Sequence, residues 1–414
     1  MNNKKWMAIL LGGIMAASLA APCSVSAAEK TTLTFWHAMG GTNGEVLQQI
    51  VDDFNASQDE IEIKAEYQGT YDDTITKLKA AMQSDSGLPD VCQMYDVGTK
   101  FMYDSGAVIP VEDKFESTGY DKSSVMEVIS SYYTVDGKQY AMPFNVSTPM
   151  LYYNKDVFEA AGLDPETPPT TYDEVLEDAK KIVESGAAPV GYSQAIYGWF
   201  FEQQLAGLGV TYGNNDNGRK EAVTAVDFDS NGGGLKVFDM WKKLYDSGCF
   251  EDYGTTTADT QTAFFSGQVG MIIESTAILK NAVDSSPFEV GTGYLPRIEQ
   301  NDEGGVIIGG GSLWLTDTGN EANEDAAWKF IEYITTPDVQ AKWSMGTGYF
   351  AINEKAYETE DMKAYLKENP NFETAINQLK DSPVNCNTAG VLSGVQTEAR
   401  LTFNEIMPQV YDGK

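Results

Sequence analysis

Short apolar runs alternate with longer segments of helical periodicity, and this alternation limits the fold more than any other feature of the chain. Residues 33–36 and 61–67 have the pattern of strands, and residues 46–54 between them carry apolar side chains at helical spacing. A second helical pattern begins at Tyr71, and residues 90–95 follow it as another strand. This βαβαβ order predicts a mainly parallel sheet with helices on both faces.

The same alternation restarts further along the chain. An extended segment at 143–154 precedes a capping-box pattern from Thr171 to Glu174 and the helical spacing of 175–183. Another short strand is predicted at 312–316, after three consecutive glycines. The sequence has no repeat and no low-complexity linker. We therefore expect two α/β lobes built from interleaved segments, and not two consecutive domains.

The charge of the chain excludes some classes of partner. Among 414 residues, 61 are acidic and 28 are basic, so the formal net charge is -33. A surface of this sign repels nucleic acid and anionic lipid, and neither is expected as a partner. The acidic net charge does not exclude an anionic ligand in a cleft, because one arginine and a few amides can set the local potential there.

The N-terminus has the pattern of a secretory signal. Two lysines precede the apolar stretch 6–21, and small residues follow at 25–27, so we expect residues 1–27 to be removed. A membrane anchor is the alternative, but the stretch is short for a span of roughly 20 residues. Lipid attachment at Cys23 is less favoured, because Pro22 precedes it. The predicted location is the periplasm or the extracytoplasmic face.

The histidine and cysteine content limits the chemistry. His37 is the single histidine, which excludes metal sites that need two imidazoles, and we expect it to have a structural hydrogen-bonding role. Cys92, Cys249 and Cys386 are widely spaced and match neither a disulfide framework nor a zinc pattern. One disulfide and three buried thiols both remain open. No metal site and no cofactor is predicted.

Four strand-end loops share small and hydroxylated residues: 36–44, 95–99, 145–148 and 274–276. In open α/β sheets, ligands bind at the carboxyl ends of strands, where loops meet helix N-termini. Glycine, serine, threonine and asparagine expose backbone N–H groups and short polar side chains there. The recurrence of this chemistry predicts a site for a polyol or a phosphate.

These loops also carry a family resemblance. The segments LTFWHAMGG (33–41), MYDVGT (94–99) and PFNVSTPMLYYNKD (143–156) resemble the bacterial extracellular solute-binding proteins of family 1, the maltose-binding-like class. IIGGGSLWL (307–315) and GTGY (346–349) more specifically resemble the glycerol-3-phosphate-binding members of ABC uptake systems. The resemblance implies an α/β fold of the periplasmic-binding-protein-like type II, with two lobes, a hinge and a ligand cleft between the lobes.

The resemblance also implies a division of the chain. Residues 28–144 and 276–340 are expected in the first lobe, and residues 145–275 and 341–414 in the second. The relatives continue beyond the position that matches residue 414, so we expect a second lobe shortened at its C-terminus.

The family's ligand contacts fall, residue by residue, on Tyr71, Asp96, Ser147, Ser275, Gly310, Tyr349 and Arg400. Asp96 stands where relatives usually have a glutamate that receives the glycerol hydroxyls. Trp199 matches one of two tryptophans of the relatives, and Ile196 stands in place of the other. These two departures bear on the identity of the ligand and not on its class. We expect Tyr71 and Asp96 in the first lobe, and Ser147, Tyr349 and Arg400 in the second.

Each of these residues also has a simpler interpretation. The Arg400 guanidinium matches two oxygens of a phosphate, but it is also suited to pair with the nearby Glu398 on a helix surface. The two serines either donate to phosphate oxygens or cap local turns. The two tyrosines and Trp199 either contact the ligand or pack in the core, and Trp199 is suited to a ring face or a choline-like group. Gly310 either offers a backbone N–H or forms a plain turn.

The function that follows is a non-enzymatic one. We expect the chain to capture glycerol 3-phosphate or a glycerophosphodiester by hinge closure, and to deliver it as a monomer to an ABC permease. A sugar or oligosaccharide is the alternative ligand. A secreted glycosidase or phosphodiesterase is the rival class, although the chain has one histidine and neither a P-loop nor a nucleophile elbow. A surface adhesin, which would bind no small molecule, is the third alternative.

Overall fold

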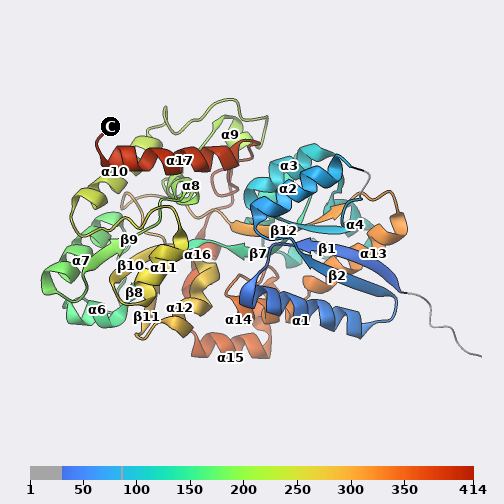
Figure 1. Ribbon diagram of the computed structural model, residues 1–414, viewed down its shortest axis with the longest axis horizontal. Helices are drawn as coiled ribbons and strands as arrows, with labels where there is room; N and C mark the ends of the chain where they lie inside the picture. The colour runs from blue at the N-terminus through green and yellow to red at the C-terminus, as the bar shows by residue number, and fades with distance from the viewer. Residues whose placement is uncertain (1–29, 85–86) are drawn as a thin grey trace, which may run out of the picture.

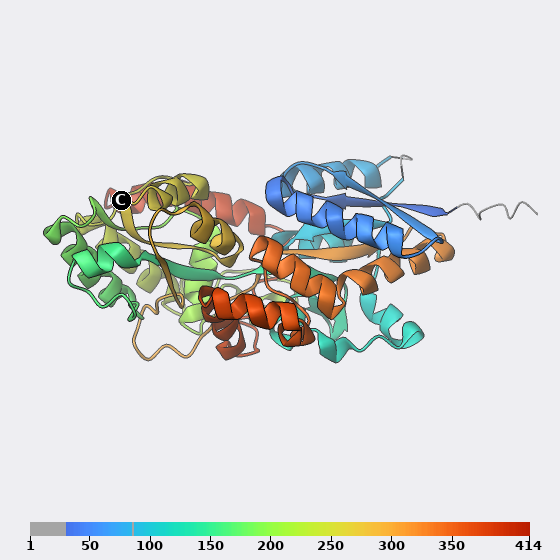
Figure 2. The same cartoon turned by 90° about the horizontal axis from the view of Figure 1, so that it is seen from below.

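Two β-sheets organise the chain in the computed structural model, which describes residues 30–84 and 87–414. One sheet has six strands in the order β2-β1-β3-β12-β4, with β7 paired to β12, and the other has four in the order β11-β8-β10-β9. Helices cover both sheets, and the sheets lie in two bodies side by side along the long axis (Figure 1), also in the view from below (Figure 2). The predicted signal segment lies outside the described residues.

The N-terminal βαβαβ unit is confirmed. β1 (Thr31–His37) pairs in parallel with β2 (Ile61–Tyr67) and with β3 (Val91–Tyr95). α1 (Gly41–Ser57) and α2 (Tyr71–Met82) form the crossovers, as the helical spacing predicted. The local pattern was sufficient here because each helix buries one apolar stripe on the sheet it has just left.

The prediction of a mainly parallel sheet is wrong for the six-stranded sheet as a whole. β12 (Gly309–Thr316) lies beside β3, and it runs antiparallel to β3, β4 (Val108–Ile109) and β7 (Met142–Ser147). β12 enters this sheet from the other body, so its direction is set by the path of the chain between the two bodies.

The positions at which the chain crosses between the two sheets differ from the predicted ones. β7 belongs to the six-stranded sheet and β8 (Pro149–Asn154) to the four-stranded one, so the first crossing is at Thr148. β11 (Val290–Gly293) is still in the four-stranded sheet, so the return falls between residues 293 and 309 and not at residue 276. α14 (Pro337–Thr347) packs on α1. We retain two discontinuous lobes as a proposal, with the crossings at these positions.

The remaining elements surround these sheets. Those before β8 are α3 (Thr99–Ser105), α4 (Val111–Thr118), α5 (Glu127–Ser130), β5 (Thr134–Val135) and β6 (Lys138–Gln139). Those from β8 to β12 are α6 (Lys155–Ala160), α7 (Tyr172–Ser185), β9 (Val190–Ser193), α8 (Gly198–Gly207), α9 (Asn214–Gly218), α10 (Gly233–Asp246), α11 (Thr257–Phe265), β10 (Val269–Ser275) and α12 (Leu279–Ser285). Those after β12 are α13 (Glu321–Ile334), α14, α15 (Glu360–Glu368), α16 (Asn371–Asp381) and α17 (Gln396–Tyr411).

Two large buried apolar clusters form most of the core of the described residues. One buried cluster is centred on the six-stranded sheet and includes Phe35 and Trp314, and a second includes Tyr192 and Trp241. The first cluster also includes Met150 and Ile272 of the four-stranded sheet, so apolar packing continues from one body into the other.

The three cysteines that the structure describes are free thiols. Cys92 is buried, whereas Cys249 and Cys386 are half-buried, so the thiol alternative is correct but only one of the three is fully buried. Across residues 30–84 and 87–414, no cluster of side chains has the composition of a metal site. Within the same residues, the helices are all too short or too polar to cross a bilayer.

His37 makes the stability of the protein depend on pH. Its ring is buried, its Nδ1 accepts a hydrogen bond from the Met39 amide at 3.3 Å, and burial lowers its pKa from 6.5 to about 4. Below pH 6.5 the unfolded chain binds a proton that the folded chain does not. The free energy of unfolding should therefore fall as the pH decreases from 6.5 to 4, by about 3 kcal/mol from this group.

We expect His37→Gln to remove that part of the pH dependence. Urea unfolding at pH 7 and pH 4.5 measures it, because the carboxylates contribute equally to both proteins. The loss of stability between the two pH values should be roughly 2–3 kcal/mol smaller in the variant. Equal losses in the two proteins would contradict the assignment.

Candidate functional site

A buried arginine joins the two bodies. Arg400 lies on α17, Glu202 on α8, and Asp96 at the first residue after β3. Arg400 Nε donates to Glu202 Oε1 at 2.8 Å, and its Nη2 donates to Glu202 Oε2 at 2.7 Å and to Asp96 Oδ2 at 2.8 Å. Arg400 Nη1 lies 3.5 Å from Asp96 Oδ1. All three side chains are buried, so water does not weaken these ion pairs.

The charges in this cluster do not cancel. One guanidinium faces two carboxylates, which leaves a formal charge of about −1. Burial by itself lowers the pKa of Arg400, but Asp96 and Glu202 outweigh it and hold the pKa above its ordinary value. Arg400 therefore stays protonated at every pH at which the protein is folded.

The local packing explains how α17 reaches α8. The buried face of α17 carries Gln396, Arg400 and Phe403. A β-carbon at Gly198, the first residue of α8, would lie 2.6 Å from the Arg400 Cα atom, so only glycine permits this approach. Gln396 Nε2 donates to Glu202 Oε1 at 2.5 Å, which holds the carboxylate from a second side.

Tyr71 and Tyr349 meet at an amide. Asn145 Nδ2 donates to the Tyr71 hydroxyl at 2.6 Å, and the hydroxyl of Tyr349 interacts with both Asn145 and Tyr71. Tyr71 stacks on Tyr95 with 5.2 Å between ring centroids, one residue before Asp96. Burial raises the pKa of Tyr71 far above its usual range, so its hydroxyl remains a donor.

Ser147 and Gly310 lie where β7 pairs with β12. Ser147 faces Gly309 in the register, and Gly310 faces Val146. Gly310 has a φ of +91°, and a β-carbon there would collide with the Asn145 carbonyl oxygen. Gly310 therefore shapes the backbone beside Asn145.

Trp199 covers the same strand end. Its ring lies against Gly309, where a β-carbon would come within 2.7 Å of the Trp199 Cζ2 atom. Its Nε1–H is buried and has no hydrogen-bond partner among the described residues. A buried N–H without a partner is costly, and Trp314 and Trp343 share this state with Trp199 among the described residues. Ile196 is buried in the core of the second body, and Trp199 belongs to the same apolar cluster, as its simpler interpretation predicted.

Ser275 has the capping role that was the simpler interpretation. Its Oγ accepts from the Ala277 amide at 3.2 Å, and its carbonyl accepts from the Tyr152 hydroxyl at 2.7 Å. The preceding Glu274 acts on the pKa of Tyr197 together with Arg400 and Asp96, so the end of β10 faces the same region.

The comparisons with known proteins show the family of the chain. Residues 49–374 match the family model described as bacterial extracellular solute-binding protein. The chain belongs to this family. The sn-glycerol-3-phosphate-binding periplasmic protein UgpB of Escherichia coli K12 is 31% identical over 391 residues, which cover 93% of this chain and 88% of the relative. UgpB of Brucella abortus strain 2308 is 32% identical over 412 residues, which cover 98% of this chain and 94% of the relative.

Solved structures give the same architecture for this solute-binding protein. The cyclic α-maltosyl-1,6-maltose binding protein of Arthrobacter globiformis superposes with a TM-score of 0.77 at 25% identity, covering 93% of this chain and 94% of that one. UgpB of Mycobacterium tuberculosis, in complex with glycerophosphocholine, superposes with a TM-score of 0.76 at 21% identity. The superposition covers 93% of this chain and 99% of that one. The predicted two-lobed, periplasmic-binding-protein-like α/β fold is confirmed.

Several sequence-based expectations about the site need correction. Arg400 pairs with Asp96 and Glu202, and not with Glu398. Arg400 and Asp96 were expected at opposite ends of a ligand, but the structure bonds them to each other. Ser147 and Tyr349 were expected in the second lobe. Ser147 is instead in the six-stranded sheet, and Tyr349 follows α14, which packs on α1.

The sequence interpretation missed Glu202, Gln396 and Asn145. Glu202 had a usable signal, because it is the one acidic residue in the otherwise uncharged segment GWFFEQQLAG. A lone charge in such a helix is buried and needs a partner. Asn145 lies in the strand-end loop 145–148 that the sequence interpretation did name, although it was not chosen as a contact. Gln396 had no signal, because an amide in a helix is common.

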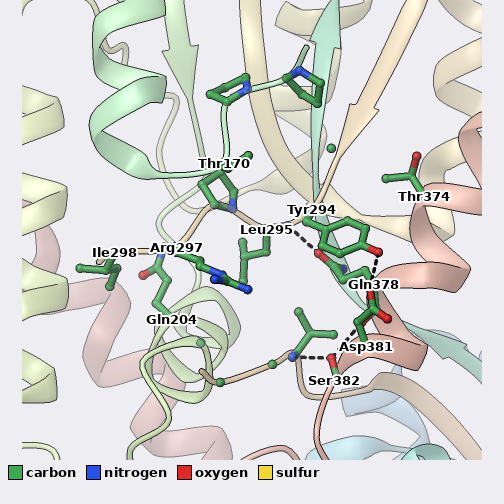
Figure 3. Close-up of a pocket in the computed structure, with 18 of the residues that line it drawn as sticks. Thr170, Gln204, Tyr294, Leu295, Arg297, Ile298, Thr374, Gln378, Asp381 and Ser382 are labelled. Carbon is green, nitrogen blue, oxygen red and sulfur yellow. Dashed lines mark hydrogen bonds between the residues drawn. The ribbon is translucent and has the colours of Figure 1, made fainter. Parts of the chain in front are cut away.

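A cavity elsewhere contains none of the predicted site residues. It has a volume of about 570 Å³ and lies beside the 293–309 connection, where the side chain of Arg297 points into it (Figure 3). Its walls include Pro168, Tyr294 and Gln378. The Arg400 cluster is the candidate site, because buried charges from both bodies meet there.

Proposed function

We propose that this solute-binding protein captures glycerol 3-phosphate or a glycerophosphodiester outside the cytoplasmic membrane and presents it to an ABC permease. The observation that carries the proposal is the buried Asp96–Arg400–Glu202 cluster, which joins a strand end of one body to two helices of the other. The names of the relatives support the ligand class, because several of them bind sn-glycerol 3-phosphate.

Hinge closure is the proposed mechanism. Asp96, Tyr71 and Ser147 come from the six-stranded body, whereas Arg400 and Trp199 come from the four-stranded body. A ligand that bonds to both groups binds the closed form better than the open form, and this difference drives closure. The unpartnered Nε1–H of Trp199 adds a donor at the line where the bodies meet.

A sugar or oligosaccharide is the second candidate ligand. The similarity to the cyclic maltosyl-maltose binding protein favours it, and so does the pair of carboxylates, which accept hydrogen bonds from vicinal hydroxyls. We propose a binding role and no catalysis for either ligand.

Isothermal titration calorimetry with glycerol 3-phosphate, glycerophosphocholine and maltose tests the proposal. We expect binding heats with the glycerol phosphates, none with maltose, and recovery of intact ligand afterwards. Heat with maltose alone would transfer the assignment to the sugar class. Release of a hydrolysed product with turnover would show an enzyme.

A further inference from the structure

Most N–H groups of the Arg400 guanidinium already donate hydrogen bonds within the protein. A guanidinium has five N–H donors. Nε donates to Glu202, both hydrogens of Nη2 are directed at Glu202 and Asp96, and one hydrogen of Nη1 faces Asp96. One N–H is left. A phosphate therefore cannot be held by two parallel bonds from Arg400 while both carboxylates stay in place.

The two carboxylates differ in how firmly they are attached. Glu202 and Arg400 lie on α8 and α17, which pack directly on each other in the same body, and Gln396 also bonds Glu202. Asp96 belongs to the other body, so its bonds to Arg400 form only when the bodies approach. A ligand entering between the bodies replaces the Asp96 contact first. Because Glu202 and Arg400 belong to the same body, we expect Glu202 to stay beside the guanidinium when the bodies separate.

From this geometry we propose that Glu202 is a specificity-determining residue, which disfavours a doubly charged phosphomonoester and favours a phosphodiester. The inference rests on the proposed function and names the substrate class within it. With Glu202 in place, the charge of Arg400 is already neutralised within its own body. A phosphomonoester at neutral pH then brings close to two negative charges toward Asp96 and Glu202, whereas a diester brings one.

The repulsion is strong because the cluster is buried. The side chains of Asp96 and Glu202 are 6% and 5% exposed, so water screens their charges weakly. Like charges brought together in such a place act as a repulsive element that selects among ligands of similar shape. The glycerol hydroxyls, common to both ligand classes, are matched to Asp96 and the tyrosine hydroxyls.

The test compares glycerol 3-phosphate with glycerophosphoglycerol, a diester with a single negative charge, by calorimetry at pH 7.5. We expect the full chain to bind the diester at least about tenfold more tightly. Glu202→Gln keeps the shape and removes the charge. It should reduce this preference by about tenfold, mainly through tighter binding of the monoester.

Two controls separate the local effect from other causes. Glu398→Gln removes a carboxylate from an exposed position on α17, the helix that carries Arg400, and should leave the preference unchanged. Glu202→Asp keeps the charge, so it should keep the preference, and it replaces Glu202→Gln as the informative variant if the latter does not fold. Thermal unfolding of each variant establishes folding.

The outcomes distinguish this inference from the proposed function. A wild-type protein that prefers the monoester, or a Glu202→Gln variant that changes both affinities equally, overturns the role of Glu202 and leaves the ligand class intact. Loss of the preference in Glu202→Asp also overturns it, because the charge is still present there. Absence of binding to both glycerol phosphates, with binding of maltose, overturns the proposed function itself.

Discussion

Arg400→Met should weaken the binding of glycerophosphodiesters by at least about 100-fold and lower the free energy of unfolding by about 3–5 kcal/mol. The methionine retains the apolar stem but leaves Asp96 and Glu202 as two buried carboxylates without a counter-charge. Their repulsion also opposes the approach of the two bodies, so the closed form is lost together with the ligand contact. Calorimetry measures the affinity, and urea unfolding measures the stability.

The matched control is Arg297→Met. Arg297 is exposed and lines the separate cavity beside the 293–309 connection, so the same substitution there should change neither quantity by more than about 0.5 kcal/mol. Combining Arg400→Met with Asp96→Asn and Glu202→Gln should recover most of the stability, because no buried charge remains, but not the binding. Unchanged ligand affinity in Arg400→Met would exclude Arg400 from the site.

Gly310→Ala is expected to be the most destabilising conservative substitution in the site, at about 3 kcal/mol or more. The new β-carbon would collide with the Asn145 carbonyl oxygen, and the φ of +91° is strained for alanine. The strands must separate to relieve the clash, which displaces Asn145 from the Tyr71 hydroxyl. Ligand affinity should fall with stability, as measured by calorimetry and urea unfolding.

Gly186→Ala separates the effect of backbone strain from the effect of the steric clash. Gly186 ends α7 with a φ of +74°, but no atom lies within 4 Å of the place that a β-carbon would occupy there, so only the backbone strain applies. We expect a cost of about 1 kcal/mol and unaltered binding. Equal costs at Gly186 and Gly310 would show that the close approach to Asn145 is not what requires glycine.

The sequence predicted those elements whose causes are local. The capping box at Thr171 and Glu174 is present, and the helix predicted over 175–183 is found as α7, which begins earlier, at Tyr172. The β1–α1–β2–α2–β3 unit is likewise correct, because each turn and each apolar stripe involves residues close together in the chain. The resemblance to solute-binding proteins extended this to the family and the two-lobed fold, which the comparisons confirm.

The positions of the predicted ligand contacts could be found only in part. Tyr71 and Tyr349 share Asn145, and Asp96 meets Arg400, so the structure does gather these distant residues. Their mutual arrangement was not predictable. Asp96 had been expected to face the polyol end of a ligand, away from Arg400, because a sequence carries no information about which of several acids an arginine will reach.

By itself, the amino-acid sequence determined the N-terminal order of strands and helices, the family and the strongly acidic character of the chain, since these depend on local periodicity, motifs and total charge. Only the tertiary structure decided that β12 runs antiparallel in the first sheet and that Arg400 is held between Asp96 and Glu202. Both are contacts between residues far apart in the chain, for example 198 positions between Glu202 and Arg400. Such contacts arise from how the two bodies pack, and packing is a property of the whole fold.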